Sequence, residues 1–193
     1  MNKKQQGDQN RVFINFVGEI NEKTNHLLIF LLTEQLRSGV SRFRINISSS
    51  GGTVFHAVSL FNFLSGLRDV DIHTHNLGQI DSAANLLFLS GTTRTASKAS
   101  SFLLHPPHMI VQERTQFPLE VLRERLEGLE KDEYKIAEII GLRLGKEREE
   151  ILQMFKDRKT YSSAEAKGLG FIQEIEEFVA APNTPIYTIT NQG

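Results

Sequence analysis

Residues 43–66 read FRINISSSGGTVFHAVSLFNFLSG, and this stretch decides the fold class. Phe43, Ile45 and Ile47 alternate with polar residues, which predicts a β-strand. The following Ser-Ser-Ser-Gly-Gly has the composition of a turn, and after it apolar residues recur at helical spacing as far as Gly66. A strand followed by a helix is the repeating unit of an α/β fold with parallel strands.

The alternation of strands and helices continues on both sides of this unit. Strands are predicted over 11–16, from Val70 to about Gly78, over 102–104 and over 186–189, and helices over 24–37, 82–89 and 147–155. Leucines and isoleucines at steps of three and four also predict one long amphipathic helix over 119–144. At 1.5 Å per residue this helix would reach roughly 37 Å, so we expect it to project toward a partner.

The organisation along the chain predicts one domain with short appendages. We expect a flexible N-terminal tail over residues 1–10, a single α/β domain over 11–180 and a C-terminal tail over 181–193. The first ten residues are polar and do not read as a signal peptide, and the longest apolar run, 27–32, is too short to span a bilayer. A cytoplasmic protein is the expectation.

Composition excludes several functional classes. Lys plus Arg is 22 and Asp plus Glu is 23, so the net charge of -1 gives no electrostatic reason to expect nucleic acid or a membrane surface as a partner. The chain has no cysteine, which excludes disulfides, thiol nucleophiles and thiolate metal sites. His73 and His75 share one face of a predicted strand, but no third ligand is visible nearby, so we expect plain surface or core histidines and no metal.

Three features together could form a serine hydrolase. Ser82 opens an apolar helix after a strand and a turn, where the helix dipole favours negative charge, although spacing alone favours a helix N-cap at Asp81 or Ser82. The amides of Gly51-Gly52 could hold an oxyanion, bind a phosphate or only turn the chain. His105 stands between an apolar strand and two prolines, which suits a general base and equally suits a structural residue.

The order of these segments resembles the proteolytic subunit of Clp-type proteases, the ClpP family of serine peptidases with the crotonase-like fold. Ile47-Ser48-Ser49-Ser50-Gly51-Gly52 is similar to its Asn-Ser-Pro-Gly-Gly turn. The segment 78–91, GQIDSAANLLFLSG, matches its Gly-Gln-Ala-Ala-Ser-Met-Gly-Ala block in length and in nucleophile position. Leu103-Leu104-His105-Pro106-Pro107 matches its Ile-His-Gln-Pro segment, and the likeness runs from about Phe13 to Ile175.

The resemblance implies a fold, a mechanism and an assembly. It implies repeated ββα units with residues 109–145 as the projecting handle segment. It implies that Ser82 is the nucleophile, His105 its base, and the amides of Gly51 and Ala83 the oxyanion hole, with no cofactor. The implied protein is a serine-type endopeptidase subunit that cleaves polypeptides through an acyl-enzyme, in a heptameric ring of identical subunits that stacks as a tetradecamer.

Departures from the family pattern leave alternatives open. The family's third catalytic residue is an aspartate, and here that position holds Lys159 or Arg158, depending on the alignment, with Asp157 the nearest acid. Asp81 replaces a family alanine and could raise the pKa of His105, cap the helix or repel the oxyanion. The family's axial loops, which engage a AAA+ ATPase unfoldase, are largely missing. A ring subunit with little or no activity is therefore the alternative function.

Overall fold

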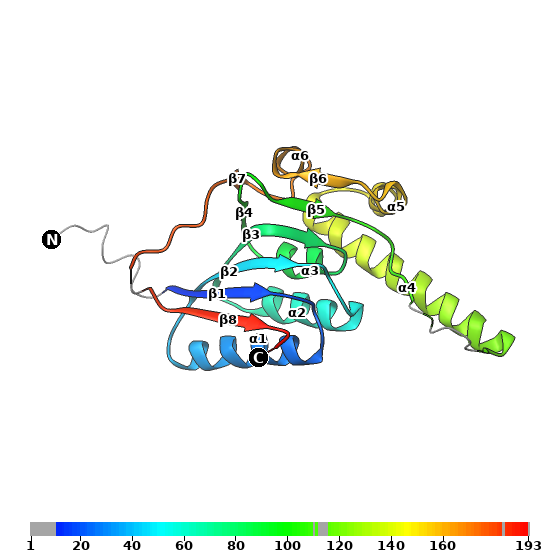
Figure 1. The fold of residues 1–193 in the computed structure, drawn as a ribbon, viewed down its shortest axis with the longest axis horizontal. Helices are drawn as coiled ribbons and strands as arrows, with labels where there is room; N and C mark the ends of the chain where they lie inside the picture. Colours follow the sequence, from blue (N-terminus) through cyan, green and yellow to red (C-terminus); the bar gives the residue numbers. More distant parts are fainter. Residues whose placement is uncertain (1–10, 110, 112–115, 183, 193) are drawn as a thin grey trace.

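One mixed sheet with helices on its faces organises the chain in the computed structural model, which describes residues 11–109, 111, 116–182 and 184–192 (Figure 1). The strands are β1 (Arg11–Val17), β2 (Arg42–Ser49), β3 (Asp71–Asp81), β4 (Thr93–Ala96), β5 (Ser101–Leu103), β6 (Thr160–Ser162), β7 (Glu174–Ile175) and β8 (Ile186–Thr190). The helices are α1 (Glu22–Arg37), α2 (Val54–Gly66), α3 (Ala84–Leu89), α4 (Leu119–Leu144), α5 (Arg148–Asp157) and α6 (Ser163–Gly168). Residues 1–10, predicted as a flexible tail, lie outside the described part.

The sheet confirms the predicted α/β class with parallel strands. Its strand order is β6-β5-β3-β2-β1-β8, with β4 paired to β3 and β7. Strands β1, β2 and β3 pair in parallel, which aligns Ile14 with Ile45, and within the described residues only the β5–β6 pair is antiparallel. Ile14, Phe16 and Ile47 are fully buried, as expected for strands whose apolar face is covered by helices.

Strand β3 is longer than predicted and positions the candidate nucleophile. The sequence analysis ended it near Gly78, but it continues to Asp81 because it changes partners. Residues 73–76 pair with β4, and residues 79–81 pair with β5. The helix predicted over 82–89 accordingly begins two residues late, at Ala84. Ser82 therefore lies in the turn between a strand and a helix.

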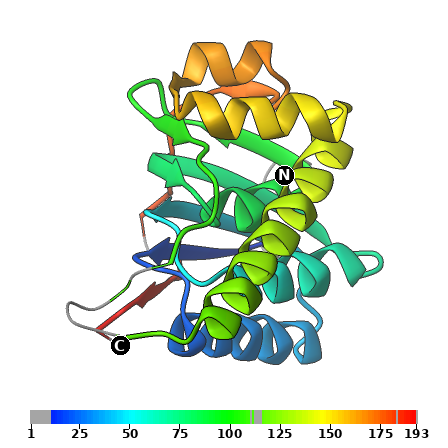
Figure 2. The same ribbon diagram turned by 90° about the vertical axis from the view of Figure 1, so that its right-hand side faces the viewer.

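Helix α4 has the bounds that its apolar spacing predicts, and it extends beyond the sheet (Figures 1 and 2). Its C-terminal half packs on the core through Ile136, Ala137, Ile140 and Gly141. Leu119, Leu122 and Leu126 in its N-terminal half are 60%, 44% and 57% exposed. Among the described residues, no helix combines the length and the apolar character needed to cross a membrane.

The segment after residue 180 contributes to the sheet. The predicted strand over 186–189 is confirmed as β8, which pairs in parallel with β1 and aligns Phe16 with Ile189. Asn191, just beyond it, accepts a hydrogen bond from the Glu19 amide at 2.7 Å. Residues that the sequence analysis set apart as a C-terminal tail thus form the edge of the sheet beside the first strand.

Candidate active site

Ser82 occupies a strained turn between β3 and α3. Its φ of 55° lies in the left-handed region, which is uncommon for a residue other than glycine and costs about 1–3 kcal/mol. Its amide donates to the Leu103 carbonyl at 2.9 Å, and its carbonyl accepts from the Asn85 side chain at 2.9 Å. A serine on such a strand-to-helix turn presents its hydroxyl outward, as in the nucleophile elbow of α/β hydrolases.

The N-cap interpretation of this segment is wrong. The N-cap of α3 is Ala83, and no side chain caps the helix. Asp81 still lies in β3, and Ser82 reaches the helix only through its backbone carbonyl. The Ser82 hydroxyl makes no hydrogen bond with any other residue that the structure describes, so it is free to react.

Gly51, the first of the two glycines after β2, approaches this turn closely. A Cβ atom on Gly51 would lie 2.7 Å from the Ser82 Cβ and 3.2 Å from the Ala83 nitrogen. Only glycine fits there, and its φ is 97°. Gly51 is buried, however, and its amide donates to the Ser49 hydroxyl at 3.2 Å. Gly52 is exposed, and in the described part of the chain neither its amide nor that of Ala83 donates to another group.

His105 faces the same cavity with one ring nitrogen already engaged. Its Nδ1 lies 2.8 Å from the carbonyl oxygen of Pro106. A carbonyl only accepts, so Nδ1 carries the hydrogen and donates it, and Nε2 keeps its lone pair. That tautomer suits a general base that takes a proton at Nε2. The ring of His108 lies 5.4 Å from the His105 ring, centroid to centroid.

One cavity of about 640 Å³ brings the candidate residues together. Its lining is Glu19, Ile20, Asn21, Ser50, Gly52, Thr53, Val54, Phe55, Ser82, His105, Pro107, His108, Leu129 and Asp132. Of the two glycines whose amides are candidates for an oxyanion hole, only Gly52 lines this cavity, whereas the family resemblance implies Gly51. The Gly-Gly pair in the sequence indicates both amides as candidates, and only the structure distinguishes between them.

Of the two acids that the sequence suggests as partners of His105, Asp81 interacts with its charge and Asp157 does not reach it. Burial raises the pKa of Asp81, and the charge of His105 partly offsets this effect. Asp157 accepts from the Gln153 side chain at 2.8 Å at the exposed end of α5, and no hydrogen bond or ion pair joins it to His105. Lys159, one candidate for the family's aspartate position, pairs with Glu165 at 2.8 Å. The structure therefore places Ser82 and His105 in one cavity, and among the described residues no carboxylate forms a hydrogen bond with the His105 ring.

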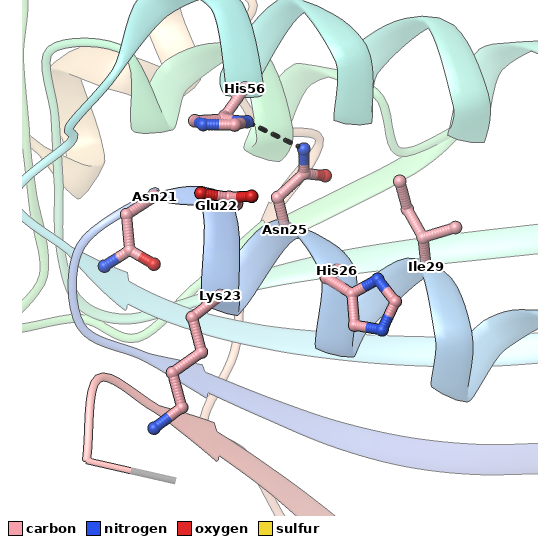
Figure 3. Close-up of a pocket in the computed structure, with 7 residues that line it drawn as sticks. All are labelled: Asn21, Glu22, Lys23, Asn25, His26, Ile29 and His56. Atoms are coloured by element: carbon pink, nitrogen blue, oxygen red, sulfur yellow. Dashed lines mark hydrogen bonds between the residues drawn. The ribbon is translucent and has the colours of Figure 1, made fainter.

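A second hollow lies beside this cavity and holds neither Ser82 nor His105. It has a volume of about 730 Å³ between the start of α1 and α2, and Figure 3 shows its lining residues. The Asn25 amide nitrogen lies 3.1 Å from the His56 Nδ1, and the Asn25 side-chain oxygen has no partner among the described residues. Size alone does not make this hollow the reactive site, because no nucleophile and base meet there.

His73 and His75 are core histidines, as expected. Both lie 2.8 Å from the Thr95 hydroxyl, and Arg44 beside them pairs with Glu176 at 3.0 Å. In the described residues no group of three histidine, aspartate or glutamate side chains could hold a metal ion. Burial, followed by the charge of Arg44, lowers the pKa of each histidine to about 4, and Glu176 opposes this effect.

This buried pair predicts a loss of stability in mild acid. The unfolded chain takes up protons below about pH 6.5, whereas the folded chain resists them until about pH 4, so the free energy of unfolding falls across that interval. The expected loss at pH 4 is about 3 kcal/mol per histidine, since one pKa unit corresponds to about 1.4 kcal/mol. Urea unfolding at pH 7, 6 and 5 measures the slope. The double variant His73→Gln, His75→Gln should flatten it, whereas a variant of the exposed His26 should not.

Three comparisons place the chain among known proteins. A family model described as Clp protease matches residues 6–178. The ATP-dependent Clp protease proteolytic subunit of Oryza sativa subsp. indica is 29% identical over 155 residues, which is 78% of this chain and 69% of that protein. Subunit 2 of the same protease from Frankia casuarinae is 28% identical over 159 residues, which is 77% of this chain and 65% of that protein. A mutant of ClpP1 from Listeria monocytogenes has a TM-score of 0.73 at 20% identity, with coverage of 91% of this chain and 95% of that one.

The sheet and its covering helices define an α/β protein with the crotonase-like fold, which confirms the predicted fold class. The family match extends over nearly the whole chain and includes both the Ser82 turn and the His105 segment. The chain belongs to the Clp protease family.

Proposed function

We propose that this chain is a serine-type endopeptidase subunit that cleaves unfolded polypeptides or peptides. The observation that supports it best is the shared cavity of Ser82 and His105, in which the serine lies on a strained turn and the histidine keeps Nε2 available. The relatives named as proteolytic subunits support the same activity.

The proposed mechanism uses Ser82, His105 and Gly52 from this cavity and the amide of Ala83, the residue after Ser82. The Ser82 hydroxyl attacks the peptide carbonyl carbon while His105 Nε2 takes its proton. The carbonyl oxygen becomes negatively charged and is held by the amides of Ala83 and Gly52, with Gly52 in place of the Gly51 of the original expectation. His105 then returns the proton to the leaving amine, which breaks the peptide bond and leaves an acyl-serine. Water, deprotonated by His105, releases the acid and restores Ser82.

A second candidate function rests on the missing carboxylate. Since the Nδ1 of His105 donates to a neutral carbonyl, no carboxylate in the described part of the chain forms a hydrogen bond with the imidazolium that forms in the reaction, and Asp81 acts on it only through space. Neutralising the triad aspartate in a serine protease lowers the rate by about 10⁴. A ring subunit with little or no turnover is therefore the alternative, and cleavage of an unfolded protein with and without an added AAA+ unfoldase separates the two functions. An increase on adding the unfoldase would also identify that class of ATPase as a partner.

A fluorophosphonate probe tests the proposed nucleophile directly. We expect covalent labelling of Ser82 in the folded protein, found by mass spectrometry on the peptide that spans residues 78–91. Ser82→Ala should remove the label, and Ser38→Ala, at an exposed end of α1, should retain it. Labelling of Ser50 instead, or no labelling of protein that is folded by circular dichroism, would contradict the proposal.

The exposed half of α4 supports assembly into rings that stack in pairs. Leu119, Leu122 and Leu126 lie on one side of the helix at steps of three and four, and all are exposed although they are apolar. A row of exposed leucines is typical of a surface that a partner covers. We propose a homo-oligomer, a heptameric ring that can stack as a tetradecamer, with this row in the contact between rings.

Charges on that row should block stacking and leave the subunit folded. The double variant Leu122→Glu, Leu126→Glu introduces two carboxylates that stacking of the rings would bury. We therefore expect the mass of the assembly to fall to half or less in sedimentation velocity. The far-UV circular dichroism should not change, because both side chains are exposed in the subunit. Glu124→Lys, which changes the charge on another side of the helix, is the control. An unchanged mass in the double variant would place the contact elsewhere.

A further inference from the structure

Two arginines meet at the end of α3 that lies opposite Ser82. Arg94 stands in β4 and is 9% exposed, and Arg143 lies in the last turn of α4. The carbonyl oxygen of Gly91 accepts from both, at 3.1 Å from Arg94 Nη1 and at 2.7 Å from Arg143 Nη2. Because one oxygen binds both side chains, the two guanidinium groups are held close to each other.

The N–H donors of Arg94 have more hydrogen-bond acceptors than those of Arg143. Arg94 also donates from Nε to the Phe171 carbonyl at 2.7 Å and from Nη2 to the Gly170 carbonyl at 3.2 Å. Arg143 has only its bond to Gly91, and its Nε is buried without a partner among the described residues. A buried N–H group with no acceptor is costly, so this one is poised to donate to a group that the chain itself does not supply.

No carboxylate balances the two charges in the part of the chain that the structure describes. Neither arginine forms an ion pair there. Asp71 contacts the cavity wall through Thr92, whose hydroxyl lies 3.5 Å from the Asp71 Oδ1, and it forms no ion pair with either arginine. Burial lowers the pKa of both guanidinium groups, and for Arg94 the charge of Arg143 lowers it further, whereas no acid raises either. Neutral carbonyls solvate these cations but leave two uncompensated charges.

Both arginines line one cavity of about 520 Å³ together with Phe61, Ser65, Thr92 and Leu142. We propose that this cavity, the arginine pocket, binds an oxyanion, a carboxylate or a phosphate. Guanidinium groups bind both anions through paired N–H donors, and the Ser65 hydroxyl in the lining can add a hydrogen bond, whereas the Thr92 hydroxyl already donates to the Ile72 carbonyl at 3.1 Å. The bound anion would accept from the Arg143 Nε and balance the charge of the pair. This site is separate from the cavity of Ser82 and does not depend on the proposed peptidase function.

Calorimetry and thermal unfolding with two simple anions test the arginine pocket. Sodium phosphate and sodium acetate are each titrated into the protein as it assembles, with ionic strength held constant by sodium chloride. We expect saturable binding of at least one of them and a matching rise in the unfolding temperature. Arg143→Gln should weaken that binding at least tenfold, and without the anion this variant should be at least as stable as the natural protein, because it lacks an uncompensated charge.

Two further variants keep the test decisive. Arg148→Gln removes an exposed arginine that pairs with Glu149, and it should bind the anion normally. Arg143→Lys keeps the charge without the paired donors and should bind more weakly than the natural protein but more tightly than Arg143→Gln. Binding that is equal in the Gln variant, or no effect of phosphate and acetate beyond that of chloride, would overturn the proposal. A loss of assembly mass in Arg143→Gln without anion binding would also overturn it, since the counter-charge would then come from a neighbouring copy.

Discussion

Replacing His105 by alanine should lower the rate of peptide cleavage by about 10³-fold or more, measured with a fluorogenic peptide at saturating concentration. The imidazole of His105 is the base of the proposed mechanism, and its Nε2 is available because Nδ1 donates to the Pro106 carbonyl. Removal of the serine or the histidine from a complete serine protease site costs about 10⁶. We expect a smaller loss here, because in the described part of the chain no carboxylate forms a hydrogen bond with the histidine.

The comparison with Ser82→Ala makes this prediction specific. Residues that act as one unit are not additive, so the double variant Ser82→Ala, His105→Ala should be no slower than either single variant. His26→Ala, an exposed histidine outside the cavity, serves as the control for the loss of an imidazole. Turnover that survives in His105→Ala would leave the histidine a structural residue of the turn. Turnover that survives in Ser82→Ala would mean that another protease in the sample cleaves the peptide.

The parts of the fold that the sequence predicted are those with a long repeated pattern. The bounds of α4 follow from a seam of apolar residues over seven turns, and the first three strands follow from alternation over five or more residues. Strands β4, β6 and β7 and helix α6 were not predicted, because two to six residues carry too little periodicity to separate them from loops. Their positions come from pairing with distant segments, such as β6 with β5.

The candidate site was predictable in its residue types and not in its finer geometry. A serine between a strand and an apolar helix, a Gly-Gly turn and a histidine before prolines are visible in the sequence. The choice between Gly51 and Gly52 depends on the Ser49 hydroxyl, which takes the amide of Gly51. The group that forms a hydrogen bond with the His105 ring likewise depends on the conformation of Pro106 and on the position of Asp157 at the end of α5. These are packing outcomes, which spacing along the chain does not encode.

Gly51→Ala should strongly destabilise the protein, with a loss of about 2–6 kcal/mol in the free energy of unfolding. The new Cβ would lie 2.7 Å from the Ser82 Cβ and 2.8 Å from the Asp81 carbonyl oxygen. Both neighbours belong to the turn that carries the nucleophile, so neither can rotate away. Overpacking of this kind costs about 1–3 kcal/mol, and alanine at a φ of 97° adds about 1–3 kcal/mol of backbone strain.

Two other glycines separate these contributions. Gly145→Ala, at a φ of 66° with no atom within 4 Å of the new methyl group, reports backbone strain alone. Gly128→Ala, exposed within α4 and equally unobstructed, should stabilise the protein by up to about 1 kcal/mol through helix propensity. Urea unfolding gives the three values, and the rate of fluorophosphonate labelling gives the effect on Ser82. Gly51→Ala could instead lose no more unfolding free energy than Gly145→Ala and keep the normal rate of Ser82 labelling. That result would mean that the glycine turn does not lie close to Ser82. The amides and the hydroxyl would then not converge, as the proposed mechanism requires.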